Sequence, residues 1–323
     1  MTDEPAKRTA PDAGIDARIC VLCNEGSGRN SREADAVGAA MAVLGPGATL
    51  RRVKGADLDT AARRAVSEGF GAIVAAGGDG TIMAVAGAVV GGPSRFGVLP
   101  LGTFNYFARG LGLPQDAEGA ARLIVAGATR RVSLGEVNGH VFLNNVSLGV
   151  YPSILRAREE VYRRWGRRRI AAHWSVAKTF LRYQRPLHLS VAMDGETHKI
   201  RTPLLFVARS AYQLETFGLA GADCVAAGRF AVFVAPDAGR AGMFHKAWRL
   251  ARRKMEEGRD FDLFCVDAIT VASRSRHLTV ACDGEKFRMR TPLTLRIRHD
   301  ALEVFVPAEA AGAGEEAAPG EAA

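Results

Sequence analysis

Apolar runs of about six residues alternate with helical patterns through the first third of the chain. Strand patterns are expected at 17–23, 49–53, 70–76 and 96–100, and helical patterns at 31–44, 57–69, 81–90 and 117–126. Short connections join each strand to a helix, which is typical of a parallel sheet with helices on both faces. Because such sheets bind ligands at the carboxyl ends of their strands, the loops after the strands are the first candidates for a site.

From Arg130 onward the pattern changes to short strands separated by tight turns. Asn138-Gly139, Asp194-Gly195 and Asp283-Gly284 are each typical of a two-residue β-hairpin turn. We therefore predict an α/β domain at 17–132, Rossmann-like in its alternation, followed by an all-β domain at 133–307. The polar residues 1–16 and the Ala-Gly-Glu-rich residues 308–323 are expected to be a disordered lead and a disordered tail.

The loop from Gly77 to Thr81 joins an apolar strand to a helix of small residues. Three glycines in four positions let the backbone turn sharply, and the following helix directs its positive end toward the same place, so the loop is a candidate phosphate cradle. A carboxylate at Asp79 would repel a bare phosphate, which favours a nucleoside triphosphate carrying Mg²⁺. The alternative is a Gly-rich turn in which Asp79 only caps the helix.

Two further strand-to-helix loops have compatible chemistry. The run from Asn24 to Asn30 contains two glycines, a serine and an arginine, and the run from Leu101 to Arg109 has a glycine and a threonine directly after its leucine. Both are expected at the same edge of the sheet as the loop from Gly77 to Thr81.

Composition and charge narrow the classes of partner. At 323 residues, with 48% hydrophobic and 24% charged residues, the chain fits two globular domains, and its net charge of +9 favours an anionic partner. A basic helical insertion at about 154–185 and a second basic stretch at 244–255 interleave Lys and Arg with aromatic residues, which suits an anionic bilayer surface. The alternative is solvated helices whose aromatic side chains face the core. No nucleic-acid-binding motif accompanies the charge, so we expect no nucleic-acid partner.

The ends and the cysteines bear on location. The first residues carry three acids and no apolar segment, so we expect a cytoplasmic protein that associates peripherally with the membrane. In that compartment the five cysteines are expected as thiols. Cys20 and Cys23 have C-x-x-C spacing, but they lie in a strand pattern where residues three apart face opposite sides, so zinc is not expected. The apolar run 72–90 is interrupted by the glycine loop and is not expected to span a membrane.

The motifs together resemble a known family. The loop from Gly77 to Thr81, followed about twenty residues later by the run from Pro100 to Arg109, resembles the catalytic domain of the diacylglycerol kinase family, which includes bacterial lipid kinases and the sphingosine and ceramide kinases. Three other segments are similar to family motifs in the same order over residues 17–306: Asn24 to Gly28, Asn144 to Gly149, and Asp283 to Glu285.

The resemblance implies an ATP- and Mg²⁺-dependent kinase of phospholipid metabolism, with its site in a cleft between a nucleotide-binding domain and a β-sandwich domain. Its substrate would be a lipid hydroxyl, diacylglycerol-like or sphingoid. The implied ATP-binding residues are Asn24, Ser27, Gly28, Gly77, Gly78, Gly80, Thr81, Gly102, Thr103 and Asn105. Asp79 would hold the metal ion. Glu285 is the candidate base, with Asp283 beside it, and Asp79 is the competing candidate for that role.

Two positions depart from the family pattern. Glu25 stands where the family usually has Pro, and Tyr106 stands where an Asp often follows Asn105. A phenol keeps its proton until about pH 10 and cannot replace a carboxylate. Two alternatives therefore stay open: a non-catalytic nucleotide- or lipid-binding protein on the same fold, and a soluble kinase resembling the NAD kinases.

Two secondary features complete the expectations. Asp194-Gly195-Glu196 repeats the late acidic triplet, and we assign this copy to a surface hairpin. An exposed strand edge could pair two copies of the chain, so a homodimer is a possible assembly.

Overall fold

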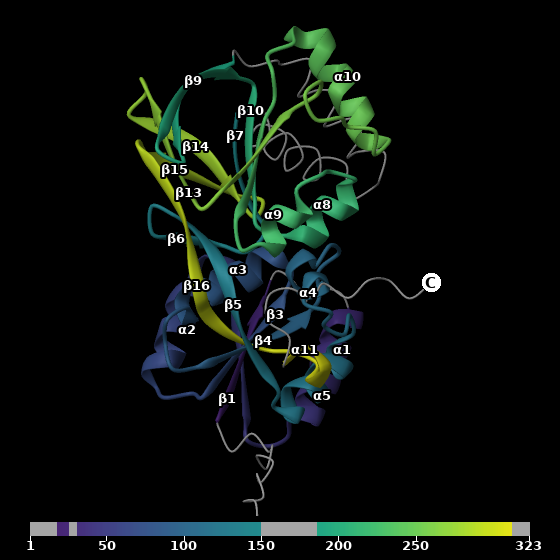
Figure 1. Cartoon of the computed structure of the whole chain (residues 1–323). Helices are drawn as coiled ribbons and strands as arrows, with labels where there is room; N and C mark the ends of the chain where they lie inside the picture. Colours follow the sequence, from purple (N-terminus) through teal and green to yellow (C-terminus); the bar gives the residue numbers. More distant parts are fainter. Residues whose placement is uncertain (1–17, 26–30, 150–185, 312–323) are drawn as a thin grey trace, which may run out of the picture.

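The structure is a computed structural model that describes residues 18–25, 31–149 and 186–311 (Figure 1). The expected lead 1–16, Ser27, Gly28 and the basic insertion at about 154–185 lie outside the described residues. Two units are stacked in Figure 1, an α/β unit below and a β-rich unit above. The expected fold class, α/β followed by all-β, is confirmed.

The α/β unit contains a parallel sheet of four apolar strands. In chain order they are β1 (Ile19–Asn24), β2 (Ala48–Val53), β3 (Ala72–Gly77) and β4 (Arg95–Pro100). Every residue of β3 is buried, as expected for a parallel strand covered on both faces. The spatial order is β2-β1-β3-β4, so the chain reverses its direction of winding between β1 and β3. Ligands of open α/β sheets bind at the carboxyl ends of the strands beside such a switch point.

Helices cover both faces of this sheet. The described elements are α1 (Ser31–Leu44), the short 3-10 turn η1 (Gly55–Asp57), α2 (Leu58–Ser67), α3 (Asp79–Val89), α4 (Tyr106–Gly110) and α5 (Ala117–Ala126). Helices α1 and α5 pack together in one apolar cluster, whereas α2 and α3 pack in the other (Figure 1). The position of α5 agrees with the predicted helix at 117–126.

The β-rich unit is built from two layers. One is a six-stranded antiparallel sheet of β7 (Asn145–Gly149), β10 (Leu204–Ala208), β11 (Phe230–Val234), β12 (Asp262–Val266), β14 (His277–Cys282) and β15 (Glu285–Arg290). The other contains β5 (Thr129–Val137), β6 (His140–Phe142), β8 (Leu187–Met193), β9 (Glu196–Thr202), β13 (Ala268–Ser273) and β16 (Leu293–Phe305). Between the layers, the rings of Phe142 and Phe230 stack with centroids 5.9 Å apart.

Four helices complete the described chain: α8 (Ala211–Phe217), α9 (Ala222–Ala226), α10 (Gly239–Ala251) and α11 (Ala308–Ala311). The helix predicted at 244–255 therefore begins five residues earlier than expected. Residues 308–311 are helical, whereas the sequence predicted disorder from 308. Among the described residues, no helix combines the length and the apolar character needed to cross a bilayer.

Strand β16 links the two units. Its first half pairs with β13, and near its end Val304 pairs in parallel with Phe96 of β4, so one ten-stranded sheet extends through both units. The pairing with β5 is interrupted between Arg298 and Leu302, where Asp300 has φ of 47°.

All three predicted hairpin turns are present. Asn138, Asp194 and Asp283 have φ of 48°, 48° and 46°, and the glycine after each is also left-handed. Asn and Asp tolerate this conformation because their short side chains hydrogen-bond locally. The assignment of Asp194-Gly195-Glu196 to a surface hairpin is confirmed, since it joins β8 to β9.

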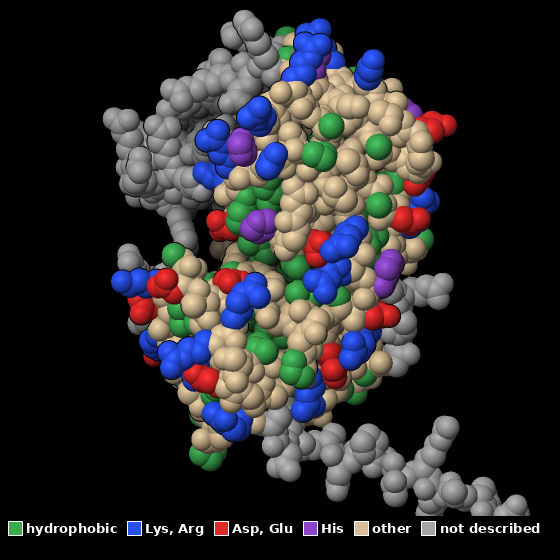
Figure 2. Space-filling model, turned by 90° about the vertical axis from the view of Figure 1, so that its left-hand side faces the viewer, with side chains coloured by type: hydrophobic (Ala, Val, Ile, Leu, Met, Phe, Trp, Pro, Cys, Tyr) green, Lys and Arg blue, Asp and Glu red, His purple; other side chains and the backbone are tan. Residues whose placement is uncertain are grey.

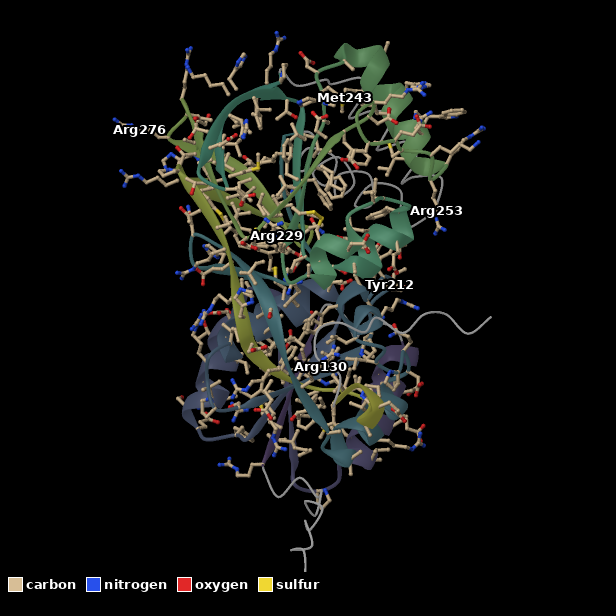
Figure 3. All side chains as sticks on the ribbon, viewed as in Figure 1. Arg130, Tyr212, Arg229, Met243, Arg253 and Arg276 are labelled. Atoms are coloured by element: carbon tan, nitrogen blue, oxygen red, sulfur yellow. A yellow bond between two sulfur atoms is a disulfide. The ribbon has the colours of Figure 1, made fainter. Side chains whose placement is uncertain are left out.

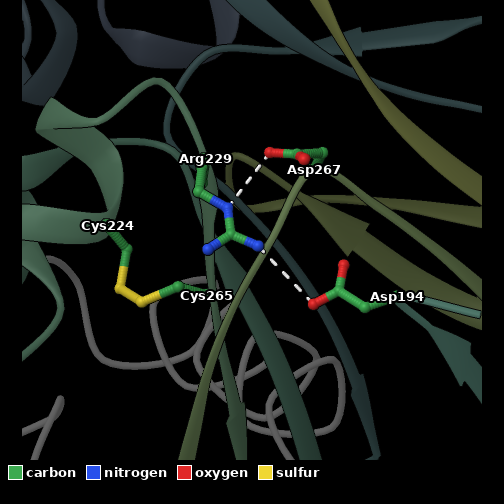
Figure 4. Close-up of a disulfide and its surroundings, with 5 residues drawn as sticks. All are labelled: Asp194, Cys224, Arg229, Cys265 and Asp267. Carbon is green, nitrogen blue, oxygen red and sulfur yellow. Dashed lines mark hydrogen bonds and ion pairs between the residues drawn. A yellow bond between two sulfur atoms is a disulfide. The ribbon is translucent and has the colours of Figure 1, made fainter. Parts of the chain in front are cut away.

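The expectation that all cysteines are thiols is wrong for one pair. Cys224 of α9 and Cys265 of β12 form a disulfide, with their Cα atoms 5.4 Å apart (Figure 4). Pairing of β11 with β12 brings together residues that are 41 positions apart in the sequence. Nearby, Arg229 forms ion pairs with Asp194 and Asp267. Cys20, Cys23 and Cys282 are buried and are not part of this disulfide.

Candidate phosphate site between the two units

The glycine loop lies at the carboxyl end of β3, where α3 begins. Gly78 is the N-cap of α3 in an extended conformation, and the first N–H groups of the helix have no partner within it. A Cβ atom on Gly77 would lie 2.5 Å from the Oγ1 of Thr81, because the buried Thr81 side chain packs back across the loop. The loop is therefore compact, and its free N–H groups can face an anion at the edge of the sheet.

A second loop is locked against the first. A Cβ atom on Gly102 would lie 2.7 Å from the Cα of Gly78 and 2.6 Å from the Oδ1 of Asn105, so only glycine fits there. Asn105 is buried and left-handed, with φ of 50°, and its Nδ2 donates to the Gly102 carbonyl at 3.0 Å. The loops that follow β3 and β4 thus meet, as the sequence predicted, and the Thr103 side chain beside them is exposed.

Asn24 ties the end of β1 to the same place. Its Nδ2 donates to the Oγ1 of Thr81 at 3.3 Å, across the switch point between β1 and β3. The hydrogen bond between Asn24 and Thr81 therefore holds the end of β1 against the first turn of α3. The expected roles of Ser27 and Gly28 stay predictions, because both residues lie outside the described ranges.

Asp79 lies half-buried between α3 and the start of α4. Its Oδ1 accepts a long hydrogen bond, 3.5 Å, from the Phe107 N–H. Burial raises the pKa of the Asp79 carboxyl, while the backbone N–H groups of Phe107, Asn105 and Tyr106 act in the opposite direction. A cation at this edge would stabilise the ionised form that burial disfavours.

Asp283 comes from the β-rich unit and has a different environment. Its Oδ2 accepts from the Leu143 N–H at 2.6 Å, and its Oδ1 accepts from the N–H groups of Asn144 and Asn145, each at 2.8 Å. Burial raises the pKa of Asp283 to about 6 despite these three donors, and the charge of nearby Asp79 adds to the shift. Both of its oxygens are occupied, so Asp283 anchors the segment that opens β7.

The side chain of Glu285 reaches the glycine loop from the other unit. A Cβ atom on Gly80 would lie 3.0 Å from the Oε1 of Glu285. Glu285 is exposed, and within the described part of the chain no hydrogen bond or ion pair engages its carboxylate. The structure therefore brings the late acidic triplet and the glycine loop together, as the predicted cleft requires.

Sequence reasoning missed a buried hydrogen bond between the segment that Asp283 anchors and helix α8. The Nδ2 of Asn145 donates to the Oε1 of Gln213 in α8 at 2.9 Å, and both residues are buried. Among the described residues, the Oδ1 atoms of Asn144 and Asn145 and the Oγ of Ser147 are buried without a partner. The sequence offered a signal for Asn144 to Gly149 through the motif, but none for Gln213.

Tyr106 enters an aromatic cluster, defined here as Phe104, Tyr106, Tyr212 and Phe217. Its ring stacks on Phe104 with centroids 5.6 Å apart and 4° between the planes, and it lies 6.0 Å from Phe217 and 6.5 Å from Tyr212. Tyr212 and Phe217 belong to α8, so the cluster joins the two units at the position of Tyr212 in Figure 3. Tyr106 therefore supplies packing where the family pattern supplies a carboxylate.

The residues present fit a phosphate-bound cation. Among the described residues, no group of three or more His, Cys, Asp or Glu is arranged to hold a metal ion. Mg²⁺ is usually bound by one or two carboxylates together with substrate phosphates and water. Asp79, at the free N–H groups of α3 and within electrostatic reach of Asp283, meets that requirement.

On the face shown in Figure 2, Lys and Arg side chains are spread over both units with Asp and Glu among them.

A glycine loop at the switch point of a parallel sheet, approached by carboxylates from an antiparallel unit, defines a class of two-unit proteins with a phosphate-compatible site at the carboxyl edge of an α/β sheet. Residues 18–137 match the family model described as the diacylglycerol kinase catalytic domain. The expected resemblance to the diacylglycerol kinase catalytic domain is confirmed for these residues, which cover the first unit and the strand β5.

Individual relatives agree with this relationship. A stretch of 90 residues is 39% identical to diacylglycerol kinases of Staphylococcus aureus strains JH9 and Newman, covering 27% of this chain and 29% of those proteins. The match thus spans less than a third of the length of these relatives. A crystal structure of a diacylglycerol kinase from Bacillus anthracis str. Sterne has a TM-score of 0.64 at 17% identity, covering 91% of this chain and 98% of that one. This similarity shows that both units share a known fold.

Proposed function

We propose that the protein is a kinase that uses ATP and Mg²⁺ to phosphorylate a lipid hydroxyl at the membrane surface. The observation that supports the proposal is the approach of the Glu285 carboxylate to Gly80, because a carboxylate from one unit then lies beside the glycine loop of the other. The family relationship of residues 18–137 supports the same activity. Diacylglycerol and sphingoid bases both offer a suitable primary hydroxyl.

The proposed roles follow from the environment of each group. The N–H groups from Gly78 to Thr81 bind the nucleotide phosphates, with the loop containing Gly102 closing the same edge. Asp79 holds the cation, and bound Mg²⁺ would neutralise the phosphate oxygens during transfer. Every other contribution comes from alignment of the acceptor with the phosphate chain.

Glu285 is the preferred base among the three acids. Both oxygens of Asp283 accept backbone N–H groups, and Asp79 accepts from Phe107, whereas the exposed Glu285 carboxylate has no such partner in the described chain. A general base must reach the proton that it removes, and Glu285 alone is free to do so without breaking a hydrogen bond. Asp283 then acts by positioning the Asn144 to Asn145 segment.

Transfer of labelled γ-phosphate from ATP to a panel of lipids in Mg²⁺-containing mixed micelles tests the proposal. Glu285→Gln should lower kcat by about 10² to 10⁴-fold, and Asp79→Asn should abolish Mg²⁺-dependent transfer. The matched control is Glu196→Gln, the same residue in the exposed copy of the triplet, which should retain activity within about twofold. Equal activity of the Glu285 and Glu196 variants would refute the assignment of the base.

The second candidate is a nucleotide- or lipid-binding protein without catalysis. It is favoured by the aromatic packing of Tyr106, because this residue supplies no carboxylate at a position where the family pattern often has an Asp. ATP binding without transfer to any lipid would support it, and gain of transfer in Tyr106→Asp would then identify the missing carboxylate. Phosphorylation of NAD but of no lipid would instead favour a soluble kinase.

A further inference from the structure

Helix α10 buries two cations beside Met243 and exposes two large apolar side chains. The cationic residues Lys246 and Arg249 face inward and are each only 8% exposed, whereas Trp248 is 44% and Leu250 is 38% exposed. A solvated helix normally buries its apolar stripe and exposes its charges. The sequence had suggested either a basic and aromatic face toward a membrane or aromatic residues toward the core, and Trp248 does not face the core.

The inward cations contact the segment that follows the helix. The Nζ of Lys246 donates to the carbonyls of Arg259 and Asp260 at 3.2 and 2.8 Å. The Nε of Arg249 donates to the buried Asp260 carboxylate at 2.7 Å, and its Nη2 pairs with Glu256 at 2.9 Å. These interactions fix the rotation of α10 about its axis, so the outward position of Trp248 is set by the fold.

The outer face combines apolar and cationic groups. The guanidinium of Arg252 lies 4.0 Å from the centre of the Trp248 ring. The His245 ring also stacks on Trp248, with the ring centroids 5.9 Å apart. Arg253 and Lys254 follow and are exposed. Exposed Trp beside Arg and Lys is typical of helices that lie in the interface of an anionic bilayer.

The outer face of α10 lies on the same flank as the aromatic cluster beside the candidate site. A Cβ atom on Gly218, which follows α8, would lie 2.7 Å from the Cβ of Arg253, so the end of α10 contacts the end of α8. Phe217, the last residue of α8, in turn contacts Tyr106, which stacks on the half-exposed Phe104. In Figure 1 α10, α8 and α4 follow one another along one side, and Figure 3 places Arg253 above Tyr212 there.

We propose that the outer face of α10 docks on an anionic lipid bilayer. Trp248 and Leu250 enter the interface, and Arg252, Arg253 and Lys254 contact the phosphate headgroups. The inference rests on the proposed lipid kinase activity for its purpose, since docking on this flank would bring the cleft to a membrane-held acceptor. The binding itself is independent of catalysis and can be measured without ATP.

Vesicle binding tests the proposal in the full-length chain. With Trp165→Phe and Trp174→Phe, Trp248 is the single tryptophan, and its emission should shift to the blue and be quenched by brominated lipids in phosphatidylglycerol vesicles but not in phosphatidylcholine vesicles. In the native chain, Trp248→Ala should weaken partitioning about tenfold. Arg252→Gln with Lys254→Gln should weaken it about 25-fold at low salt, about fivefold for each cation. Val125→Ala, at a residue 41% exposed on α5, is the matched control and should bind normally.

The outcomes separate docking from catalysis. Vesicle binding that is unchanged by Trp248→Ala, or Trp248 emission that stays unquenched, would overturn the proposal even if the kinase activity is established. A change from dimer to monomer in Trp248→Ala with normal vesicle binding would also overturn it, because the face would then bind a second copy. Loss of binding in Trp248→Ala with normal transfer to a water-soluble short-chain acceptor would support it, and absence of transfer in every variant would refute only the kinase.

Discussion

Replacing Gly80 by alanine should separate activity from stability. Gly80 is the second residue of α3, and its φ is not in the left-handed region, so alanine is compatible with the helix. The added methyl group would, however, lie 3.0 Å from the Oε1 of Glu285. That contact is shorter by about 0.5 Å or more than an ordinary van der Waals separation. The end of the flexible Glu285 side chain should therefore move while the backbone stays in place.

The two expected effects have opposite signs. Alanine in place of glycine within a helix stabilises the folded state by about 0.5–1 kcal/mol. Displacement of a catalytic group by about 1 Å can lower the rate by about 10²-fold. We therefore expect Gly80→Ala to unfold at the same or a slightly higher temperature than the native chain, with kcat for lipid phosphorylation lowered about 10- to 100-fold.

The matched control is Gly87→Ala in the same helix, where nothing lies within 4 Å of the added methyl group. It should show the same gain in stability with unchanged activity. Calorimetry and labelled-phosphate transfer on the three proteins measure both quantities. If Gly80→Ala retains activity within about twofold while its stability rises, the Glu285 carboxylate does not work beside the glycine loop and the assignment of the base fails.

Three other substitutions test separate parts of the structure. Gly102→Ala places its methyl group 2.7 Å from the Cα of Gly78, a backbone atom that cannot yield, and should destabilise the fold by about 1–3 kcal/mol in urea denaturation. Asp260→Ala leaves Arg249 buried without its carboxylate and should cost about 3–5 kcal/mol, with a lower urea midpoint. The pKa of Asp283 is raised to about 6, so the folded state binds more protons than the unfolded state between about pH 4 and 6. The stability of the native chain relative to Asp283→Asn should therefore fall by about 2 kcal/mol as the pH rises from 4 to 7, and a constant difference would show that Asp283 does not titrate there.

Local patterns predicted the cradle well because each of its determinants is close in sequence. The strand before Gly77, the helix after it and the hairpin residue pairs are all specified by neighbouring residues, and the parallel sheet follows from the alternation of strands and helices. The meeting of Gly102 with Gly78 could be expected because both follow adjacent strands of one sheet.

Long-range contacts decided what the sequence could not predict. Asp194 and Asp283 occupy the same turn position in the same triplet, yet Asp194 retains 55% of its side-chain exposure while Asp283 receives three backbone N–H groups. Only the placement of Leu143 beside β14 distinguishes them. The rotation of α10 likewise depends on Asp260, and the disulfide depends on the pairing of β11 with β12.

The late position of β16 in the sequence affects how the chain can fold during its synthesis. Thr129 and Glu303, which share a hydrogen bond between β5 and β16, are 174 residues apart, and Val304 covers the edge of β4. On the ribosome, the N-terminal unit emerges long before this strand is synthesised. The edge of β4 therefore stays unpaired until β16 has been synthesised. A nascent chain stopped before β16 should bind chaperones through this edge, even though all four parallel strands are already present.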